Sequence, residues 1–422
     1  MLKTVISINS LLLAVAILLV GSGLLGTTIA LRTGLEGYSK SLAGFIMSGF
    51  FLGYFIGAYV CPRIVQGVGH IRAFAAFAAI GCVAVLLHGL VVNAMVWWVL
   101  RVITGMSMLG LYLIIESWLN GLSQQTLRGR VFAVYMTINL LALAVGQYLI
   151  LVYGVAGVAP FALVAIFFAL ALVPVALTRM QAPAHVAVPE LGLRRLYGIS
   201  PLGATGALVT GLTNGAFWGL GPLFASSIGL HASGVAFVMS GVSLGGAVVQ
   251  WAIGHLSVGA VRRRVLAGVS LAGAVAAAAA FVLAGTSLAG LLVAAIVYGG
   301  FSFSVYSLSV AHTNDHLDPG EILGATRGLL MLSGIGSTVG PLLAGLIMDL
   351  STPRILMAYM ALMLMVLAGF AALRMRVSAP IPLAEQAEFV PLARTSPEML
   401  ELDPRAEVEG EPSPEPAAEE GS

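Results

Sequence analysis

Charged residues are scarce in this chain of 422 residues: Asp, Glu, Lys and Arg together make up 9% of it. Ordinary soluble domains carry about 25%, so the chain has too little charge to cover a water-exposed surface. Its mean hydropathy is +1.01. Eleven of the eighteen acidic residues also lie in one segment, between Glu385 and Ser422. The composition therefore argues against a soluble globular fold and predicts a membrane protein.

Cysteine is scarce as well. The two cysteines, Cys61 and Cys82, both lie in apolar segments, so the sequence offers neither a disulfide framework nor a paired-cysteine metal motif. Nothing in it resembles a phosphate-binding loop, a metalloprotease helix or a nucleophile elbow. We expect no cofactor, no resident metal and no enzymatic activity.

Long apolar runs are abundant. A membrane-spanning helix needs about 20 apolar residues, and runs bounded by charge, proline or glycine predict twelve such helices. The first run is too long for a cleaved signal peptide and lacks a convincing small-residue cleavage site. The weakest boundary is Gly285-Thr-Ser287, between the ninth and tenth runs. The predicted spans are 9–31, 41–62, 72–92, 94–118, 130–153, 157–178, 201–226, 233–256, 264–284, 287–311, 323–349 and 353–373.

Two stretches of the sequence repeat each other. Phe45-Ile-Met-Ser-Gly-Phe-Phe-Leu-Gly53 recurs 192 residues later as Phe237-Val-Met-Ser-Gly-Val-Ser-Leu-Gly245, and Gly105 is matched by Gly299 after 194 residues. Six helices per copy is an even number, so both copies enter the membrane with the same orientation, as parallel repeats. Doubled bundles of this kind hold a ligand site between their halves, near the bilayer midplane, which makes transport the first hypothesis.

The domain organisation follows from this repeat. We expect an all-α polytopic membrane protein of twelve transmembrane helices, with six-helix bundles at 1–178 and 201–376. The linker 179–200, which contains Pro183 and Pro189, joins the two bundles. Residues 377–422 are rich in Pro, Glu and Ala and have little to bury, so we expect a disordered acidic tail.

Basic residues in the short loops predict the orientation in the membrane. With the N-terminus inside, fourteen of them are cytoplasmic and only Arg32, Lys40 and Arg354 lie outside. We therefore expect both termini and the linker to be cytoplasmic, in a bacterial inner membrane. The fourteen cytoplasmic positions are Lys3, Arg63, Arg72, Arg128, Arg130, Arg179, Arg194, Arg195, Arg262, Arg263, Arg264, Arg327, Arg374 and Arg376.

One face of the fourth predicted helix is polar. Arg101, Gly105, Met108, Tyr112 and Glu116 follow one another at spacings of 4, 3, 4 and 4, and this spacing places them on one side of a helix. Charge facing lipid is costly, so Arg101 and Glu116 should face the bundle interior or an aqueous cavity. Arg101 either meets an anionic group or locks neighbouring helices. Glu116 either exchanges a proton as its exposure alternates or anchors the helix end at the membrane interface.

Two predicted helices of the second half carry polar stripes as well. The seventh has Asn214 and Trp218 four residues apart, and the tenth has Tyr298 and Tyr306 eight residues apart. Such stripes either line a pore or provide hydrogen bonds between helices. The seventh and tenth helices hold places related to those of the fourth and first, and this favours a shared cavity wall.

Several motifs resemble those of the major facilitator superfamily, across about residues 1–376. Arg101-Val-Ile-Thr-Gly105 is similar to the arginine–glycine motif of the family's fourth helix. Gly254 to Arg263 resembles the loop after its eighth helix, although the family's aspartate is Val258 here and its following arginine is Gly259. The matching loop from Gly57 to Arg72 also lacks the aspartate. The charge relay that latches the inner gate in this family is therefore incomplete.

A second group of motifs narrows the resemblance. Glu116-Ser-Trp-Leu-Asn120, Arg128-Gly-Arg130 and Gly69-His-Ile-Arg72 together are most similar to the bacterial YcaD-like branch of the superfamily. The resemblance implies the major facilitator fold and a transport process, without indicating a cargo. The arginines that it marks as gating-loop candidates are Arg63, Arg72, Arg128, Arg130, Arg262 and Arg263.

The sequence thus predicts a secondary transporter that moves a small solute by alternating access, with protons as the candidate coupling ion. One alternative is a polytopic membrane enzyme, for which His312-Thr-Asn-Asp-His-Leu-Asp318 is the only candidate site, although this run fits a solvated helix end better than a metal site. The other is a receptor or scaffold with the same fold. We expect a monomer in the lipid bilayer, with no nucleic-acid partner. The candidate substrate or coupling residues are Arg101, Tyr112, Glu116, Asn214, Trp218, Tyr298 and Tyr306.

Overall fold

The computed structural model describes the chain apart from residues 1, 123–127, 179–190, 258–260, 378–385 and 387–422. Its described part is built of helices and contains no β-strand. Three of the helices are short: α6 (Ile150–Tyr153), α8 (Leu193–Ile199) and η1 (Pro319–Glu321). The long helices are α1 (Leu2–Leu35), α2 (Lys40–Val68), α3 (His70–Leu90), α4 (Ala94–Leu122), α5 (Arg128–Tyr148), α7 (Ala159–Leu177), α9 (Pro201–Ser227), α10 (Ala232–Ser257), α11 (Arg262–Leu283), α12 (Leu288–Asn314), α13 (Ile322–Leu350) and α14 (Ile355–Val377).

Eleven of these long helices are long and apolar enough to cross a membrane, counted over the described residues. The exception is α9, which contains six glycines as well as Thr210, Thr213 and Asn214. Most of α9 is buried, and it packs against α12, α13 and α14. A helix that its neighbours shield from lipid does not need an apolar surface of its own, so we count α9 with the other membrane helices.

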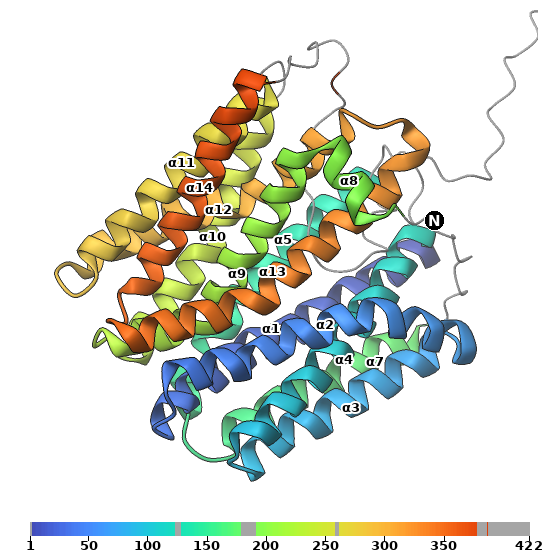
Figure 1. The fold of residues 1–422 in the computed structure, drawn as a ribbon. Coiled ribbons are helices and arrows are strands. Elements are labelled where there is room, and N and C mark those ends of the chain that lie inside the picture. Colours follow the sequence, from blue (N-terminus) through green and yellow to red (C-terminus); the bar gives the residue numbers. More distant parts are fainter. Residues whose placement is uncertain (1, 123–127, 179–190, 258–260, 378–385, 387–422) are drawn as a thin grey trace, which may run out of the picture.

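The two halves of the chain pack in the same way. In the first half, α1 packs on α5, α2 on α4, and α3 on both α4 and α7. In the second half, α9 packs on α13, α10 on α12, and α11 on both α12 and α14. Figure 1 shows the halves as two bundles, the first in blue to green and the second in green to red. The three-dimensional packing therefore repeats as the sequence does.

Glycines set the distance between the crossing helices of each half. A Cβ added to Gly53 or Gly105 would lie 1.9 or 2.0 Å from a carbonyl oxygen of the other helix in the α2–α4 pair. A Cβ added to Gly245 or Gly299 would lie 2.0 or 2.3 Å from a carbonyl oxygen across the α10–α12 pair. No side chain fits at these distances, so small residues are required for the close packing of the helices. The repeated glycines of the sequence are the contact points of its repeated helix pairs.

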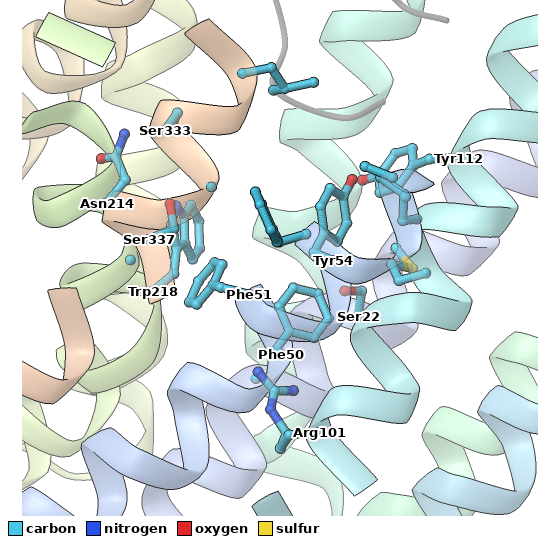
Figure 2. A pocket seen from close by; sticks show the side chains of 18 of the residues that line it. Ser22, Phe50, Phe51, Tyr54, Arg101, Tyr112, Asn214, Trp218, Ser333 and Ser337 are labelled. Atoms are coloured by element: carbon cyan, nitrogen blue, oxygen red, sulfur yellow. The ribbon is translucent and has the colours of Figure 1, made fainter. Parts of the chain in front are cut away.

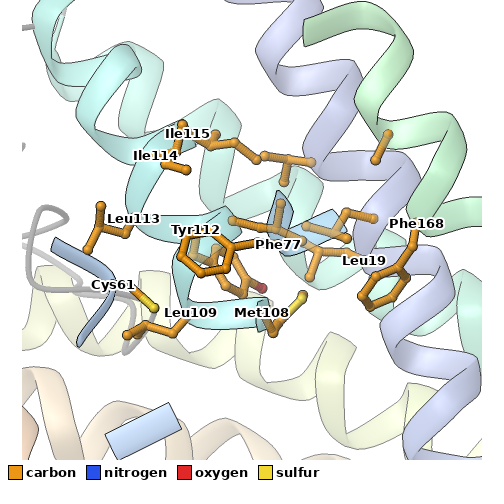
Figure 3. Packing of buried hydrophobic residues seen from close by; sticks show 14 of the residues in the cluster. Leu19, Cys61, Phe77, Met108, Leu109, Tyr112, Leu113, Ile114, Ile115 and Phe168 are labelled. Atoms are coloured by element: carbon orange, nitrogen blue, oxygen red, sulfur yellow. The ribbon is translucent and has the colours of Figure 1, made fainter. Parts of the chain in front are cut away.

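A hydrophobic core surrounds α4 in the first half. Figure 3 shows Leu109 and Leu113 of α4, with Phe77 of α3 and Phe168 of α7 nearby, and all four residues are buried. The residues of α4 from Leu111 to Glu116 are all buried as well. This core holds α4 in a fixed position, and α4 carries three of the candidate functional residues.

The two halves meet mainly through α2 with α13, α5 with α10, and α1 with α9. At one end of the bundle, the backbone N–H groups of Lys40 and Ser41 donate to the two carboxylate oxygens of Asp349, at N···O distances of 2.8 and 2.7 Å. A Cβ on Gly44 would lie 2.2 Å from the carbonyl oxygen of Pro341, so α2 and α13 are in backbone contact there. We call this the Asp349 end. The first residues of α1 and the whole of α8 lie at the opposite end (Figure 1), which we call the α8 end.

Candidate substrate site

A central cavity of about 280 Å³ lies between the two halves. This volume is close to the lower limit for small-molecule sites, roughly 300 Å³. The first half contributes residues of α1, α2, α4 and α5, and the second contributes residues of α9, α10 and α13. The lining residues that bear on function are Ser22, Thr27, Phe50, Phe51, Tyr54, Phe55, Tyr59, Arg101, Tyr112, Gln147, Asn214, Trp218, Arg327, Ser333 and Ser337.

Aromatic side chains form much of the cavity wall. Figure 2 shows Tyr54 and Tyr112 on the side of the first half, with Trp218 facing them from the second. The rings of Tyr54 and Tyr112 lie edge to face, with centroids 6.5 Å apart. Phe50 and Phe51 lie between these two sides. The wall can therefore enclose a flat apolar group from several directions.

Arg101 lies at the deep end of this cavity, beneath Phe50 (Figure 2). Its side chain is 4% exposed, and its guanidinium carbon lies 4.5 Å from the centroid of the Phe50 ring. The Nε–H group has no hydrogen-bond partner among the described residues. A buried charge without a counter-ion is costly in a membrane protein, and this marks Arg101 as the least satisfied group of the site.

Arg327 is a cavity residue that the sequence did not indicate. The loop-charge count treats it as a cytoplasmic residue near the start of a helix. In the structure α13 begins at Ile322, and Arg327 lies in its second turn, half-buried and on the cavity wall. Gly334 and Ser337 follow it at helical spacing and also line the cavity. This spacing could have revealed the shared face.

Tyr112 connects the cavity wall to a buried polar network. Its hydroxyl donates to Oδ1 of Asn139 at 3.3 Å, and the Asn139 amide donates to the carbonyl oxygen of Tyr135 at 2.8 Å. The Tyr135 hydroxyl donates in turn to the Glu116 carboxylate. Glu116 has no exposed surface, so it lies inside the helix bundle and not at a solvated helix end. The sequence analysis missed Tyr135 and Asn139, although their spacing of four residues places them on one face of α5.

The second-half candidates divide into two groups. Asn214 and Trp218 line the cavity, as expected. Tyr298 and Tyr306, in contrast, are 0% and 1% exposed and are not among the cavity-lining residues. The stripe on α12 serves to bind α9, since the Ser302 hydroxyl donates to Oδ1 of Asn214 at 3.3 Å. The expectation that both tyrosines line the cavity is therefore wrong for this structure.

The four gating-loop arginines whose side chains are described are not among the cavity-lining residues. Arg63 and Arg72 are exposed. Arg262 and Arg263 are buried at the start of α11. Arg128 and Arg130 lie in the first turn of α5, and their side chains are outside the described part of the structure.

The polar run from His312 to Asp318, which resembles a metal cluster in the sequence, lies at the end of α12. Arg262 forms an ion pair with Asp315 and donates to the carbonyl oxygen of Ala311 at 2.9 Å. The Nδ1 atom of His316 lies 2.7 Å from the carbonyl oxygen of His312. These groups hold the end of α12 against α11. The run is a polar helix end, as predicted, but its Arg262–Asp315 ion pair is buried and not solvated as expected.

Twelve long helices in two similarly packed halves, with a cavity between them, define a multi-pass membrane protein with the architecture of a solute carrier. The chain belongs to the Major Facilitator Superfamily, whose family model matches residues 11–321. The expected fold class and the transporter family are thereby confirmed.

Relatives with curated descriptions support the same branch. An uncharacterized MFS-type transporter of Enterobacter sp. (strain 638) is 26% identical over 353 residues, which are 80% of this chain and 88% of that protein. The uncharacterized MFS-type transporter YcaD of Escherichia coli is 24% identical over 348 residues, with the same coverage of 80% and 88%. The resemblance to the YcaD-like branch is confirmed.

Solved structures share the fold at low sequence identity. The nucleoside transporter NupG superposes with a TM-score of 0.74 at 13% identity, over 87% of this chain and 98% of that one. A bacterial homologue of the human lysosomal transporter Spinster, in an inward-facing and occupied conformation, gives 0.73 at 14% identity, over 90% and 97%. At these identities the likeness extends to the fold alone.

Proposed function

We propose that this protein is a secondary active transporter that moves a small solute across the membrane by alternating access. The observation that carries the proposal is the position of the cavity. It lies between two similarly packed halves, and its lining runs from Arg101 to Arg327, near the start of α13 at the α8 end. At the Asp349 end, α2 and α13 are in backbone contact. Rocking of one half against the other would expose such a site to each side in turn.

The contact at the Asp349 end is suited to repeated opening. The Asp349 carboxylate caps the N-terminus of α2, and the groups involved are exposed to solvent. An anion at an exposed helix N-terminus contributes only about 0.3–1 kcal/mol. Binding of substrate or a proton in the cavity can offset an energy of this size, so the cap itself does not prevent this end from opening.

Reconstitution into liposomes tests the proposed activity. A transporter gives saturable uptake that follows a solute or proton gradient, whereas a receptor or scaffold binds solute without net flux. A membrane enzyme would convert the solute chemically, which chromatography of the recovered material detects.

We propose that residues 1–178 and 201–376 form the two moving domains, that residues 179–200 link them, and that the protein acts as a monomer. Residues 179–190 of that linker and nearly all of the 377–422 tail lie outside the described residues.

We also propose that both termini are cytoplasmic and that the protein lies in a bacterial inner membrane. Tyr197 on α8 is 53% exposed, and His231 is exposed at the Asp349 end beside the start of α10. Single-cysteine variants Tyr197→Cys and His231→Cys, made with Cys61→Ser and Cys82→Ser, report the two ends. We expect an impermeant maleimide to label His231→Cys in intact cells, and Tyr197→Cys only after lysis. Labelling of Tyr197→Cys in intact cells would reverse the assigned orientation.

A further inference from the structure

We infer that the central cavity takes a small organic anion with an aromatic or other apolar body. This inference rests on the proposed transport function and assigns its substrate class. Two arginines line the cavity, Arg101 and Arg327, and none of the described lining residues is acidic. The described part of the cavity wall therefore offers no carboxylate to neutralise Arg101.

The described carboxylates are engaged elsewhere or lie outside the cavity. Five of the described acids have partners: Glu36 with Arg32, Glu321 with Arg195, Asp315 with Arg262, Asp349 with the start of α2, and Glu116 with Tyr135. The remaining described acid, Asp318, is exposed beyond the end of α12. A counter-ion for Arg101 from the described chain is thus missing, and a bound anion would supply it.

Because Arg101 is buried, a counter-ion beside it would stabilise the protein. Its guanidinium packs on Phe50, and its Nε–H group lacks an acceptor among the described residues. A planar guanidinium binds a carboxylate, sulfonate or phosphate through two parallel hydrogen bonds, which are stronger than bonds between neutral groups. A neutral ligand would leave the buried charge uncompensated, and a cation would add repulsion. The deep end of the cavity therefore favours an anionic group.

The two arginines lie at different depths. Gly44 lies against Pro341, while Arg101 lies against Gly49, five residues farther along α2. Because α2 and α13 run in opposite directions, Arg101 is level with about residue 337 of α13. Arg327 is about ten residues, or roughly 15 Å, closer to the α8 end. Arg327 can draw an anion toward the cavity, and Arg101 can hold its charged group at the bottom.

Between the two arginines, the wall is suited to an apolar body. Phe51, Tyr54 and Trp218 surround this space in Figure 2, and Phe55 and Tyr59 also line it. Aromatic rings favour stacked or edge-on contacts with a flat ligand. The combination of a deep cation and an aromatic wall selects an amphiphilic anion over a purely hydrophilic one such as inorganic phosphate.

Thermal unfolding of the purified full-length protein tests the inference with ligands that share one ring system. Indole-3-acetate, indole-3-acetamide and tryptamine present an anion, a neutral group and a cation on the same body. We expect indole-3-acetate and its sulfonate and phosphate analogues to raise the unfolding midpoint, and the amide and amine to leave it unchanged. Arg101→Met should remove this stabilisation, and Arg327→Met should weaken it. Arg264→Met, at an exposed arginine outside the cavity, is the matched control.

A second readout needs no ligand. If Arg101 carries a buried charge that only a bound anion neutralises, Arg101→Met removes that cost and should raise the unfolding midpoint of the ligand-free protein by about 1–3 °C. A purely structural arginine would give the opposite result, a lower midpoint. Stabilisation of the wild type by the amide or amine as strongly as by the anions would overturn the inference, as would a panel in which no anion stabilises.

The same panel in liposomes separates this inference from transport itself. Anions that bind but are not moved would contradict the transport function and leave the anion site standing. Uptake of neutral or cationic solutes only would contradict the anion site and leave transport standing. Lysophosphatidylglycerol is added as a lipid anion, and stabilisation by it alone would support the anion site and assign its source to the bilayer.

Discussion

Glu116→Gln is expected to abolish accumulation driven by a pH gradient, while substrate binding and exchange persist. Glutamine has nearly the shape of glutamate and can still accept the hydrogen bond from Tyr135, but it cannot take up a proton. The network from Tyr112 through Asn139 and Tyr135 gives Glu116 a link to the cavity wall. A pH difference of one unit supplies about 1.4 kcal/mol per proton, which corresponds to roughly tenfold accumulation. A proton that accompanies a monoanion moves no net charge, so the membrane potential does not add to this driving force.

The measurement compares two modes in the same liposomes. Counterflow exchange of labelled substrate at equal pH requires no proton movement, whereas uptake against a concentration gradient at unequal pH does. Tyr135→Phe is the control, because it removes the hydrogen bond and keeps the carboxylate, so accumulation should survive with an altered pH profile. Equal pH-driven accumulation by Glu116→Gln and the wild type would assign Glu116 a structural role.

Gly105→Ala is expected to cause one of the largest losses of stability among single-methyl changes in the first half, similar to that of Gly53→Ala across the same helix pair. The added Cβ would lie 2.0 Å from the carbonyl oxygen of Phe50, a backbone atom that cannot move without shifting α2. Overpacking of a tight core typically costs about 1–3 kcal/mol and sometimes more. Because the contact involves backbone on both sides, we expect at least the upper end of this range.

A matched control lies in the partner helix α2. An added Cβ on Gly67 meets nothing within 4 Å, so Gly67→Ala should be neutral or stabilising, by up to about 1 kcal/mol from helix propensity. Thermal unfolding and size-exclusion profiles of the two variants provide the comparison. Gly299→Ala should repeat the defect of Gly105→Ala in the second half. Wild-type unfolding of Gly105→Ala would show that the helix pair is not held at this distance.

These glycines also show what the sequence could predict. The recurrence of Gly53 as Gly245 and of Gly105 as Gly299 predicted two related bundles, and the structure has those positions at equivalent helix crossings. Hydropathy gave the twelve helices to within a few residues at most ends. The span 201–226 is close to α9, Pro201–Ser227, although glycine and threonine lower its hydropathy. Features that depend on a single helix or on the repeat could therefore be predicted from the sequence.

The cavity wall was harder to predict, because it depends on which neighbour a helix face meets. The stripe of Tyr298 and Tyr306 has helical spacing, but that spacing is the same whether the face meets a cavity or another helix. In the structure this face is buried. Arg327 was missed for a related reason. The sequence alone does not distinguish a charge in the second turn of a helix from a charge in the preceding loop, because it does not show how far the cavity extends along the helix.

Thiol labelling at Ser337 tests the central claim of alternating access most directly. Ser337 lines the cavity from α13 and is 8% exposed, and Ser337→Cys in the cysteine-free chain needs no known substrate. In oriented vesicles, an impermeant reagent should label it quickly from the α8 side and slowly from the Asp349 side. Asp349→Asn, which weakens the cap on α2, should speed labelling from the Asp349 side, while His231→Cys stays accessible from that side throughout. Labelling of Ser337→Cys from the α8 side alone, with and without Asp349→Asn, would contradict alternating access.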